Sequence, residues 1–201
     1  MDEPSPVAPR NYLLPVVPLK DHCLFPGAVT DLALDIAGAA RAIETGLRNG
    51  GRVLALGTRE IPAAPRDLSP IGTIAEVGAQ HAEDGAARVE LVGLGRARVV
   101  ASWSGDSLVA EVEPIAEGDA GDEWGPAVEA LARYLHAHAS LRELLDGKRR
   151  SADPMAWVNL ACQILPITAS ARQKLLEADA AARCLKISRG LDALLRKEQS
   201  A

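Results

Sequence analysis

The sequence is poor in several residue types that mark particular classes of protein. Aromatic residues make up 3% of the 201 residues, so a folded core must be built from aliphatic side chains. The cysteines Cys23, Cys162 and Cys184 are odd in number and far apart, which argues against a disulfide framework and fits a reducing compartment. No stretch approaches the roughly 18 consecutive apolar residues of a membrane-spanning helix, so no membrane partner is expected.

A surplus of basic residues is also absent. Lys and Arg number 22 against 27 Asp and Glu, for a formal net charge of -5. Neutralising nucleic-acid phosphates requires clustered positive charge, so a nucleic-acid partner is not expected. The first dozen residues lack the basic and apolar regions of a secretory signal, which predicts a cytoplasmic protein.

The motifs of common catalytic sites are missing. Gly147-Lys148 resembles the end of a phosphate-binding loop, but Arg142 stands where the earlier glycine is required. There is no G-x-S-x-G nucleophile elbow, HExxH or CxxC. His136 and His138 are two positions apart and cannot share a metal ion across a helix. The sequence therefore predicts no cofactor, no metal and no enzymatic activity.

One pair of neighbours invites a catalytic interpretation. His22 precedes Cys23, and a histidine can activate a thiol. Neighbouring residues in an extended segment point to opposite sides, which disfavours contact between the two side chains. A buried cysteine beside an exposed histidine is the favoured interpretation.

The most unusual stretch present runs from Leu13 to Gly27. It is apolar and contains Pro15, Pro18 and Pro26 together with Phe25, the only phenylalanine. Proline donates no backbone hydrogen bond, so an extended segment of this kind is expected at a sheet edge or in an irregular region. Pro26-Gly27 predicts a turn.

The remaining pattern predicts an α+β protein. Residues 1–12 are expected to be a flexible tail, residues 13–118 a β-rich subdomain with one helix near 38–48, and residues 119–201 a helical subdomain. Asp153, Thr168 and Asp179 are candidate N-caps for helices of that part, with Ser170 competing against Thr168. Gly93-Leu94-Gly95 indicates a bulge or a corner. The helical part is predicted to be a four-helix bundle.

Several motifs, in order along the chain, resemble a known family. The opening fits LP-x-x-PL-K-D-x-x-LFPG, and matches follow at 52–56, 71–77, 88–99, 108–113, 165–168 and 173–177. This series resembles the N-terminal domain of the ATP-dependent protease Lon. The resemblance implies a PUA-like pseudo-barrel followed by helices. It also implies recognition of polypeptide substrates and a role in assembly.

The function predicted from these observations is non-catalytic recognition of unfolded or extended polypeptides by an adaptor or binding protein. Full-length Lon and a second copy of the chain are candidate partners, because the sequence ends where the resemblance places the start of the ATPase. A self-standing or Lon-associated peptidase component and an RNA-related accessory protein remain as alternatives. Phe25 and Trp103 are the candidate polypeptide contacts, although Phe25 is also expected to fill the β core.

Overall fold

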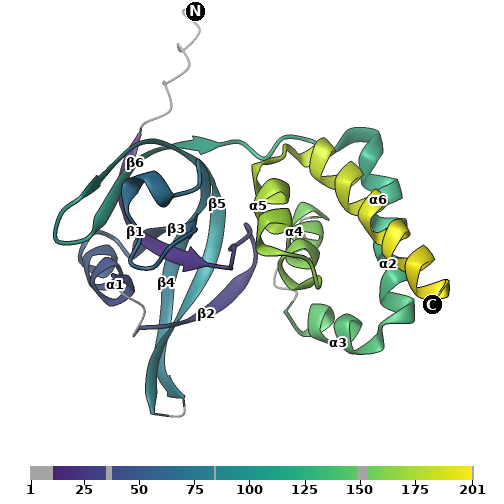
Figure 1. The fold of residues 1–201 in the computed structure, drawn as a ribbon, viewed down its shortest axis with the longest axis horizontal. Helices are drawn as coiled ribbons and strands as arrows, with labels where there is room; N and C mark the ends of the chain where they lie inside the picture. The colour runs from purple at the N-terminus through teal and green to yellow at the C-terminus, as the bar shows by residue number, and fades with distance from the viewer. Residues whose placement is uncertain (1–10, 35–37, 84, 149–153, 201) are drawn as a thin grey trace, which may run out of the picture.

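The computed structural model describes residues 11–34, 38–83, 85–148 and 154–200. A mixed sheet forms one part of the molecule and a group of helices lies beside it (Figure 1). The strands are β1 (Tyr12–Lys20), β2 (Val29–Ala33), β3 (Arg52–Thr58), β4 (Ile71–Glu83), β5 (Ala86–Ser104) and β6 (Leu108–Ile115). The α-helices are α1 (Ala39–Arg48), α2 (Trp124–Ala137), α3 (Ala139–Lys148), α4 (Pro154–Ile164), α5 (Ala169–Glu177) and α6 (Ala180–Gln199), with short 3-10 helices η1 (Pro65–Asp67) and η2 (Gly121–Glu123). The predicted α+β class is confirmed.

The sheet closes into a small barrel. Its strand order is β2-β5-β4-β3-β1-β6, and β5 also pairs with β6. Strands β5, β4, β3, β1 and β6 therefore form a ring, while β2 pairs with the first half of β5, at residues 88–92. The barrel interior is filled by small and aliphatic residues: Leu14, Val16, Leu54, Leu56, Ala97, Ala110 and Val112. An aliphatic core is what the low aromatic content requires.

Strand β1 shows how a proline-rich segment can lie inside a sheet. Tyr12–Pro15 pair with β6, and Val16–Lys20 pair with β3. In this register each β1 residue pairs on one side only, so every part of the strand is locally an edge and tolerates proline. The predicted edge position is thus wrong for the strand as a whole, because β1 lies between β3 and β6. Its residues face both the barrel interior and the larger core, which explains their apolar character.

Strand β5 is a single bulged strand of 19 residues. Ile74 pairs with Gly95 and Ala75 pairs with Gly93, which leaves Leu94 as an extra residue. The bulge predicted at Gly93-Leu94-Gly95 is confirmed. A second register shift leaves Val100 unpaired.

The described C-terminal residues form five α-helices, so the predicted four-helix bundle is wrong in its helix count. The first predicted helix is interrupted at His138, whose φ of -129° and ψ of 73° depart from helical geometry. A ring nitrogen of His138 lies 2.8 Å from the carbonyl oxygen of Tyr134. The predicted caps Thr168 and Asp179 are confirmed, since each side chain accepts a backbone hydrogen bond from the residue three positions later. The cap predicted at Asp153 lies outside the described residues.

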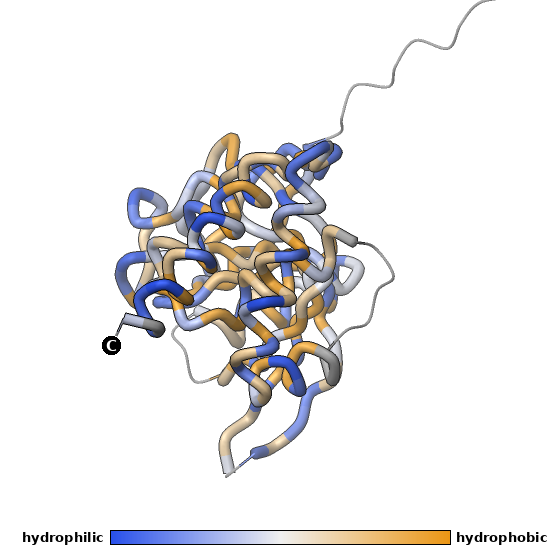
Figure 2. Tube along the Cα trace, turned by 90° about the vertical axis from the view of Figure 1, so that its right-hand side faces the viewer, coloured by the Kyte–Doolittle hydropathy of each residue, from blue (hydrophilic) through white to orange (hydrophobic). Residues whose placement is uncertain are grey.

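The barrel and the helices share one hydrophobic core. The larger cluster of buried residues contains Leu24 and Phe25 from the opening stretch, Ile43 from α1, and Leu131, Val158 and Leu176 from α2, α4 and α5. Seen from the helical side, hydrophobic segments run through the middle of the molecule (Figure 2). The boundary predicted at residues 118–119 falls between β6 and η2, and this core extends across it.

Candidate functional site

The segment after β1 joins the barrel to the helices. Gly27 N–H donates to the carbonyl of Gly93 at 2.8 Å, and Gly93 N–H donates to the carbonyl of Ala28 at 2.9 Å. On the helical side, Phe25 N–H donates to Oε1 of Gln163 in α4 at 3.0 Å. The chain reverses at Gly27, where φ is +79° and a side chain would be strained. The segment therefore lies between β5 and α4.

Phe25 does not contribute to an accessible surface. Its side chain is 0% exposed and belongs to the core shared by the barrel and the helices. The prediction that Phe25 is buried is confirmed. The prediction that Phe25 contacts a bound polypeptide is wrong, because the ring is covered on all sides. Phe25 therefore contributes to the fold by packing in this shared core.

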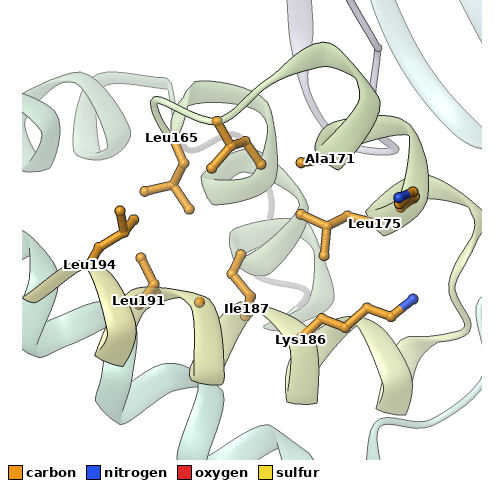
Figure 3. Close-up of a pocket in the computed structure, with 10 residues that line it drawn as sticks. Leu165, Ala171, Leu175, Lys186, Ile187, Leu191 and Leu194 are labelled. Carbon is orange, nitrogen blue, oxygen red and sulfur yellow. The ribbon is translucent and has the colours of Figure 1, made fainter. Parts of the chain in front are cut away.

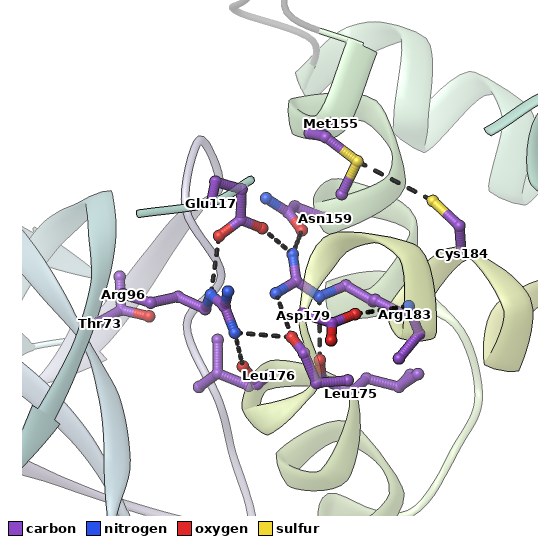
Figure 4. Close-up of polar contacts among 12 residues, drawn as sticks. Thr73, Arg96, Glu117, Met155, Asn159, Leu175, Leu176, Asp179, Arg183 and Cys184 are labelled. Atoms are coloured by element: carbon purple, nitrogen blue, oxygen red, sulfur yellow. Dashed lines mark hydrogen bonds and ion pairs between the residues drawn. The ribbon is translucent and has the colours of Figure 1, made fainter. Parts of the chain in front are cut away.

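A buried ionic cluster links the same two parts. Arg96 of β5 and Arg183 of α6 each pair with the carboxylate of Glu117, which follows β6 (Figure 4). The Arg96 Nε–Glu117 Oε2 distance is 2.7 Å, and the side chains of Arg96 and Arg183 are 2% and 0% exposed. Arg183 also donates to Oδ1 of Asn159 in α4. One carboxylate thus serves two buried guanidinium groups from different parts of the fold.

The two arginines also bind the carboxyl end of α5. Arg96 donates to the carbonyls of Leu176 and Ala178, and Arg183 donates to those of Leu175 and Ala178. These carbonyls have no partner inside the helix, and positive charge is favourable at this end. Burial, followed by the nearby charge of Arg183, lowers the pKa of Arg96. The cluster fixes α5 against β5 and α6.

An apolar groove opens beside α5. It has a volume of about 430 Å³ and is lined by the α4–α5 connection, α5 and α6 (Figure 3). Leu165, Leu175, Ile187, Leu191 and Leu194 point into it in Figure 3. Gly190 of α6 also lines the groove, and a Cβ atom added there would meet nothing within 4 Å. Volumes of roughly 300–1,000 Å³ are typical of sites that hold ligands.

A polar cleft lies on the barrel side of α5. Its volume is about 540 Å³, and its lining includes Asp21, His22, Arg59, Arg66 and Glu177. Gln173 crosses the base of this cleft, where it donates to the Ile71 carbonyl and to Glu177. Lys174 lines both the cleft and the groove. Helix α5 therefore separates an apolar surface from a polar one.

Trp103 is placed on the outer surface of the barrel. It pairs with Val109 of β6, and Val109 pairs with Pro15 of β1. Leu13 shares this outward face, since it lies two residues before Pro15. Trp103 is 48% exposed and Leu13 is 67% exposed. Trp103, a candidate contact from the sequence, is therefore accessible on this face, whereas the groove was not located from the sequence.

All three cysteines are buried and none has the setting of a nucleophile. Burial raises the pKa of Cys23 to about 11 and that of Cys162 to about 12, and it also raises the pKa of Cys184. His22 is exposed whereas Cys23 is buried, as expected for neighbours pointing apart. The Cys23 thiol instead lies 3.4 Å from Oε1 of Gln173.

We expect the native protein to react slowly with a thiol reagent near neutral pH, and all three cysteines to react after denaturation. Folding raises the pKa values of the thiols, so keeping them neutral contributes to stability. This contribution is fully present below pH 9.0, the pKa of an unfolded cysteine. This stabilisation should be lost as the pH rises through about 11, the pKa of folded Cys23. Chromogenic disulfide titration and unfolding curves at increasing pH measure both effects. Rapid modification of one native thiol would contradict this assignment.

The described residues hold neither a metal-binding cluster nor a membrane-spanning helix. No group of three or more His, Cys, Asp or Glu side chains there is placed to hold a metal ion. Within the same residues, no helix combines the length and the apolar character needed to cross a membrane.

The chain is similar in sequence to part of known Lon proteases. Lon protease 1 of Thermus thermophilus is 32% identical over 180 residues, which cover 82% of this chain and 22% of that protein. Lon protease of Buchnera aphidicola is 30% identical over 115 residues, which cover 55% of this chain and 15% of that protein. The chain therefore matches about a fifth or less of these relatives' length.

Solved structures show the same fold. The N-terminal domain of Lon protease from the Mycobacterium avium complex has a TM-score of 0.74 at 24% identity, covering 90% of this chain and 98% of that one. A Lon N-terminal domain protein from Xanthomonas campestris has a TM-score of 0.61 at 23% identity, covering 87% and 95%. The family model described as the ATP-dependent protease La (LON) substrate-binding domain matches residues 13–192. The chain belongs to the family of LON substrate-binding domains.

Proposed function

We propose that this domain binds unfolded or extended polypeptides and catalyses no reaction on them, acting as an adaptor or as the recognition part of a Lon-type system. The apolar groove beside α5 is the observation that supports this proposal. Its lining is aliphatic apart from Gly190 and two lysines, so it offers water-excluded surface without hydrogen-bonding selectivity. A site of this kind suits side chains that are exposed only when a protein is unfolded.

The size of the groove is consistent with moderate affinity. Full burial of one Leu or Ile side chain contributes about 1.5–3 kcal/mol. Two or three such side chains contribute about 3–9 kcal/mol, and the entropy lost when the chain is ordered reduces this to binding weaker than micromolar. Weak, reversible binding of many sequences is what polypeptide recognition requires.

The test uses a fluorescently labelled, permanently unfolded polypeptide and fluorescence anisotropy. We expect the unmodified domain to bind it, and Gly190→Trp to weaken binding at least about tenfold because the indole fills the groove. Gly190→Ala is the matched control and should change binding less than about twofold. Both variants should fold, since position 190 has free space and replacing a helical glycine with alanine stabilises by about 0.5–1 kcal/mol. Absence of binding at high micromolar concentrations of the unmodified domain would exclude the proposal.

Trp103 is proposed as a second contact, on the outer barrel face with Leu13 and Val109. Half-exposed tryptophans are frequent anchors of protein interfaces. Trp103→Ala should weaken the same binding by a smaller factor than Gly190→Trp. If instead only Trp103→Ala weakens binding, the polypeptide site lies on the barrel and not in the groove.

Full-length Lon and a second copy of this domain are the proposed protein partners. Crosslinking in native lysate followed by identification of the captured chains distinguishes them. Recovery of Lon supports an adaptor, whereas recovery of this chain alone supports self-association.

A further inference from the structure

We propose that the groove beside α5 selects polypeptide segments in which aliphatic side chains lie next to acidic ones. This inference rests on the proposed function and specifies its substrate class. The partner is an unfolded chain carrying a short aliphatic–acidic motif, held by apolar burial at one end of the groove and by charge at the other.

The first observation is the position of two lysines. Lys174 of α5 and Lys186 of α6 line the groove together with its aliphatic residues. Both lysines lie toward the turn that joins α5 to α6, because α5 ends at Glu177 and α6 begins at Ala180. Leu194 is two helical turns further along α6, roughly 12 Å from Lys186. Figure 3 shows Lys186 and Leu194 at opposite ends of the row of α6 side chains. The groove therefore has an apolar end and a basic end.

The second observation is that these charges are not neutralised within the domain. Both lysines are exposed. None of the groove-lining residues is acidic, and no ion pair among the described residues includes Lys174 or Lys186. Glu177 is close to Lys174 in sequence and also lines the polar cleft with it, but its carboxylate accepts a hydrogen bond from Gln173 at 2.9 Å and forms no ion pair with Lys174.

The third observation is the contrast with the rest of the chain. The protein carries a formal net charge of -5, so the basic end of the groove is a local feature on an acidic protein. Acidic segments are attracted to this end of the groove, whereas the net charge of the protein disfavours their approach elsewhere. Lysine is suited to this task because its flexible ammonium group reaches carboxylates in many geometries. Charge complementarity of this type adds selectivity and favours rapid association.

The test compares three labelled peptides of equal length that share one aliphatic stretch. They differ only in the two residues that flank this stretch on each side, which are Glu, Gln or Lys. An exposed ion pair contributes about 0.2–1 kcal/mol, so two pairs should make the Glu peptide bind roughly five times more tightly than the Gln peptide. The Lys peptide should bind more weakly than both. The preference should shrink at high salt, since screening shortens the reach of exposed charges.

Variants assign the preference to the groove. Lys174→Glu combined with Lys186→Glu should reverse it, so that the Lys peptide binds best. Lys197→Glu is the matched control, because Lys197 is exposed on α6 and does not line the groove; it should retain the preference. Circular dichroism should show that all variants are folded.

The outcomes separate the inference from the proposed function. Equal binding of the three peptides, or a preference that survives the double variant, overturns the inference and leaves polypeptide binding intact. Binding of the unfolded polypeptide without binding of any peptide overturns the inference as well. If the unmodified domain binds neither the peptides nor the unfolded polypeptide, the proposed function itself fails.

Discussion

Replacing Glu117 with glutamine is expected to lower the free energy of unfolding by about 3 kcal/mol. Arg96 and Arg183 would keep their buried positive charges and lose the carboxylate that they share. Removing one partner of a buried ion pair typically costs about 3–5 kcal/mol. The loss should lie at the lower end of this range because the Glu117 side chain is 26% exposed. Water can therefore partly solvate the charges that lose their partner.

Urea denaturation followed by circular dichroism measures this loss, and the matched control is Glu113→Gln. Glu113 pairs with Arg98 at 3.5 Å, but the two side chains are 40% and 59% exposed. An exposed pair of this kind contributes about 0–1 kcal/mol, so the control should unfold close to the unmodified domain. Equal losses in the two variants would show that the buried cluster has no special role in stability.

The Glu117 variant also reports on how the two parts are coupled. The cluster and the shared core both join the barrel to the helices. Breaking the ionic link leaves the hydrophobic one, so we expect a single unfolding transition at lower denaturant concentration. Two separate transitions would indicate that the cluster, and not the core, makes the parts unfold together.

Local sequence signals predicted much of the fold. Thr168 and Asp179 begin helices because their side chains accept hydrogen bonds from the first turn, a requirement that acts within four residues. The glycines after Arg48 end α1, and the register shift at Leu94 follows from the glycines on both sides. The break at His138 was missed, because no proline or glycine marks it and the apolar pattern continues toward α3.

The ionic cluster and the groove depend on tertiary contacts and were not predicted from the sequence. Arg96 was part of a family-like motif, yet nothing local shows that its partners are Glu117 and the end of α5. Similarly, the helical spacing predicts one face of α6 made of Leu185, Ser188, Leu191 and Leu195, and of these only Leu191 lines the groove. Whether that face is filled or left open depends on how α5 packs against α6, so the groove becomes visible only in the structure.

Gly93→Ala should be among the most damaging single substitutions in the domain. A Cβ atom at this position would lie 2.2 Å from the backbone oxygen of Phe25 and 3.0 Å from its carbonyl carbon. Backbone atoms cannot rotate away as the end of a side chain can, so the opening stretch would have to move off β5. Overpacking of a tight core costs about 1–3 kcal/mol and occasionally more, and here we expect at least about 3 kcal/mol.

Gly95→Ala is the matched control, two residues further along the same strand. A Cβ atom there would meet nothing within 4 Å, so the variant should unfold within about 0.5 kcal/mol of the unmodified domain. Denaturant unfolding of the pair measures the difference. If Gly93→Ala is too unstable for that measurement, amide hydrogen exchange gives a local readout. The amides of Phe25 and Gly27, bonded to Gln163 and Gly93, should then exchange faster.

The contrast between these glycines tests how the opening stretch acts. If its importance lies in packing, Gly93→Ala should loosen the contact between the barrel and α4, because Phe25 N–H is the group that bonds to Gln163. The groove is lined by other residues, which belong to the α4–α5 connection, α5 and α6. Polypeptide binding by the folded fraction should therefore persist while stability falls. A loss of binding larger than the loss of folded protein would instead place the opening stretch within the recognition surface, despite the burial of Phe25.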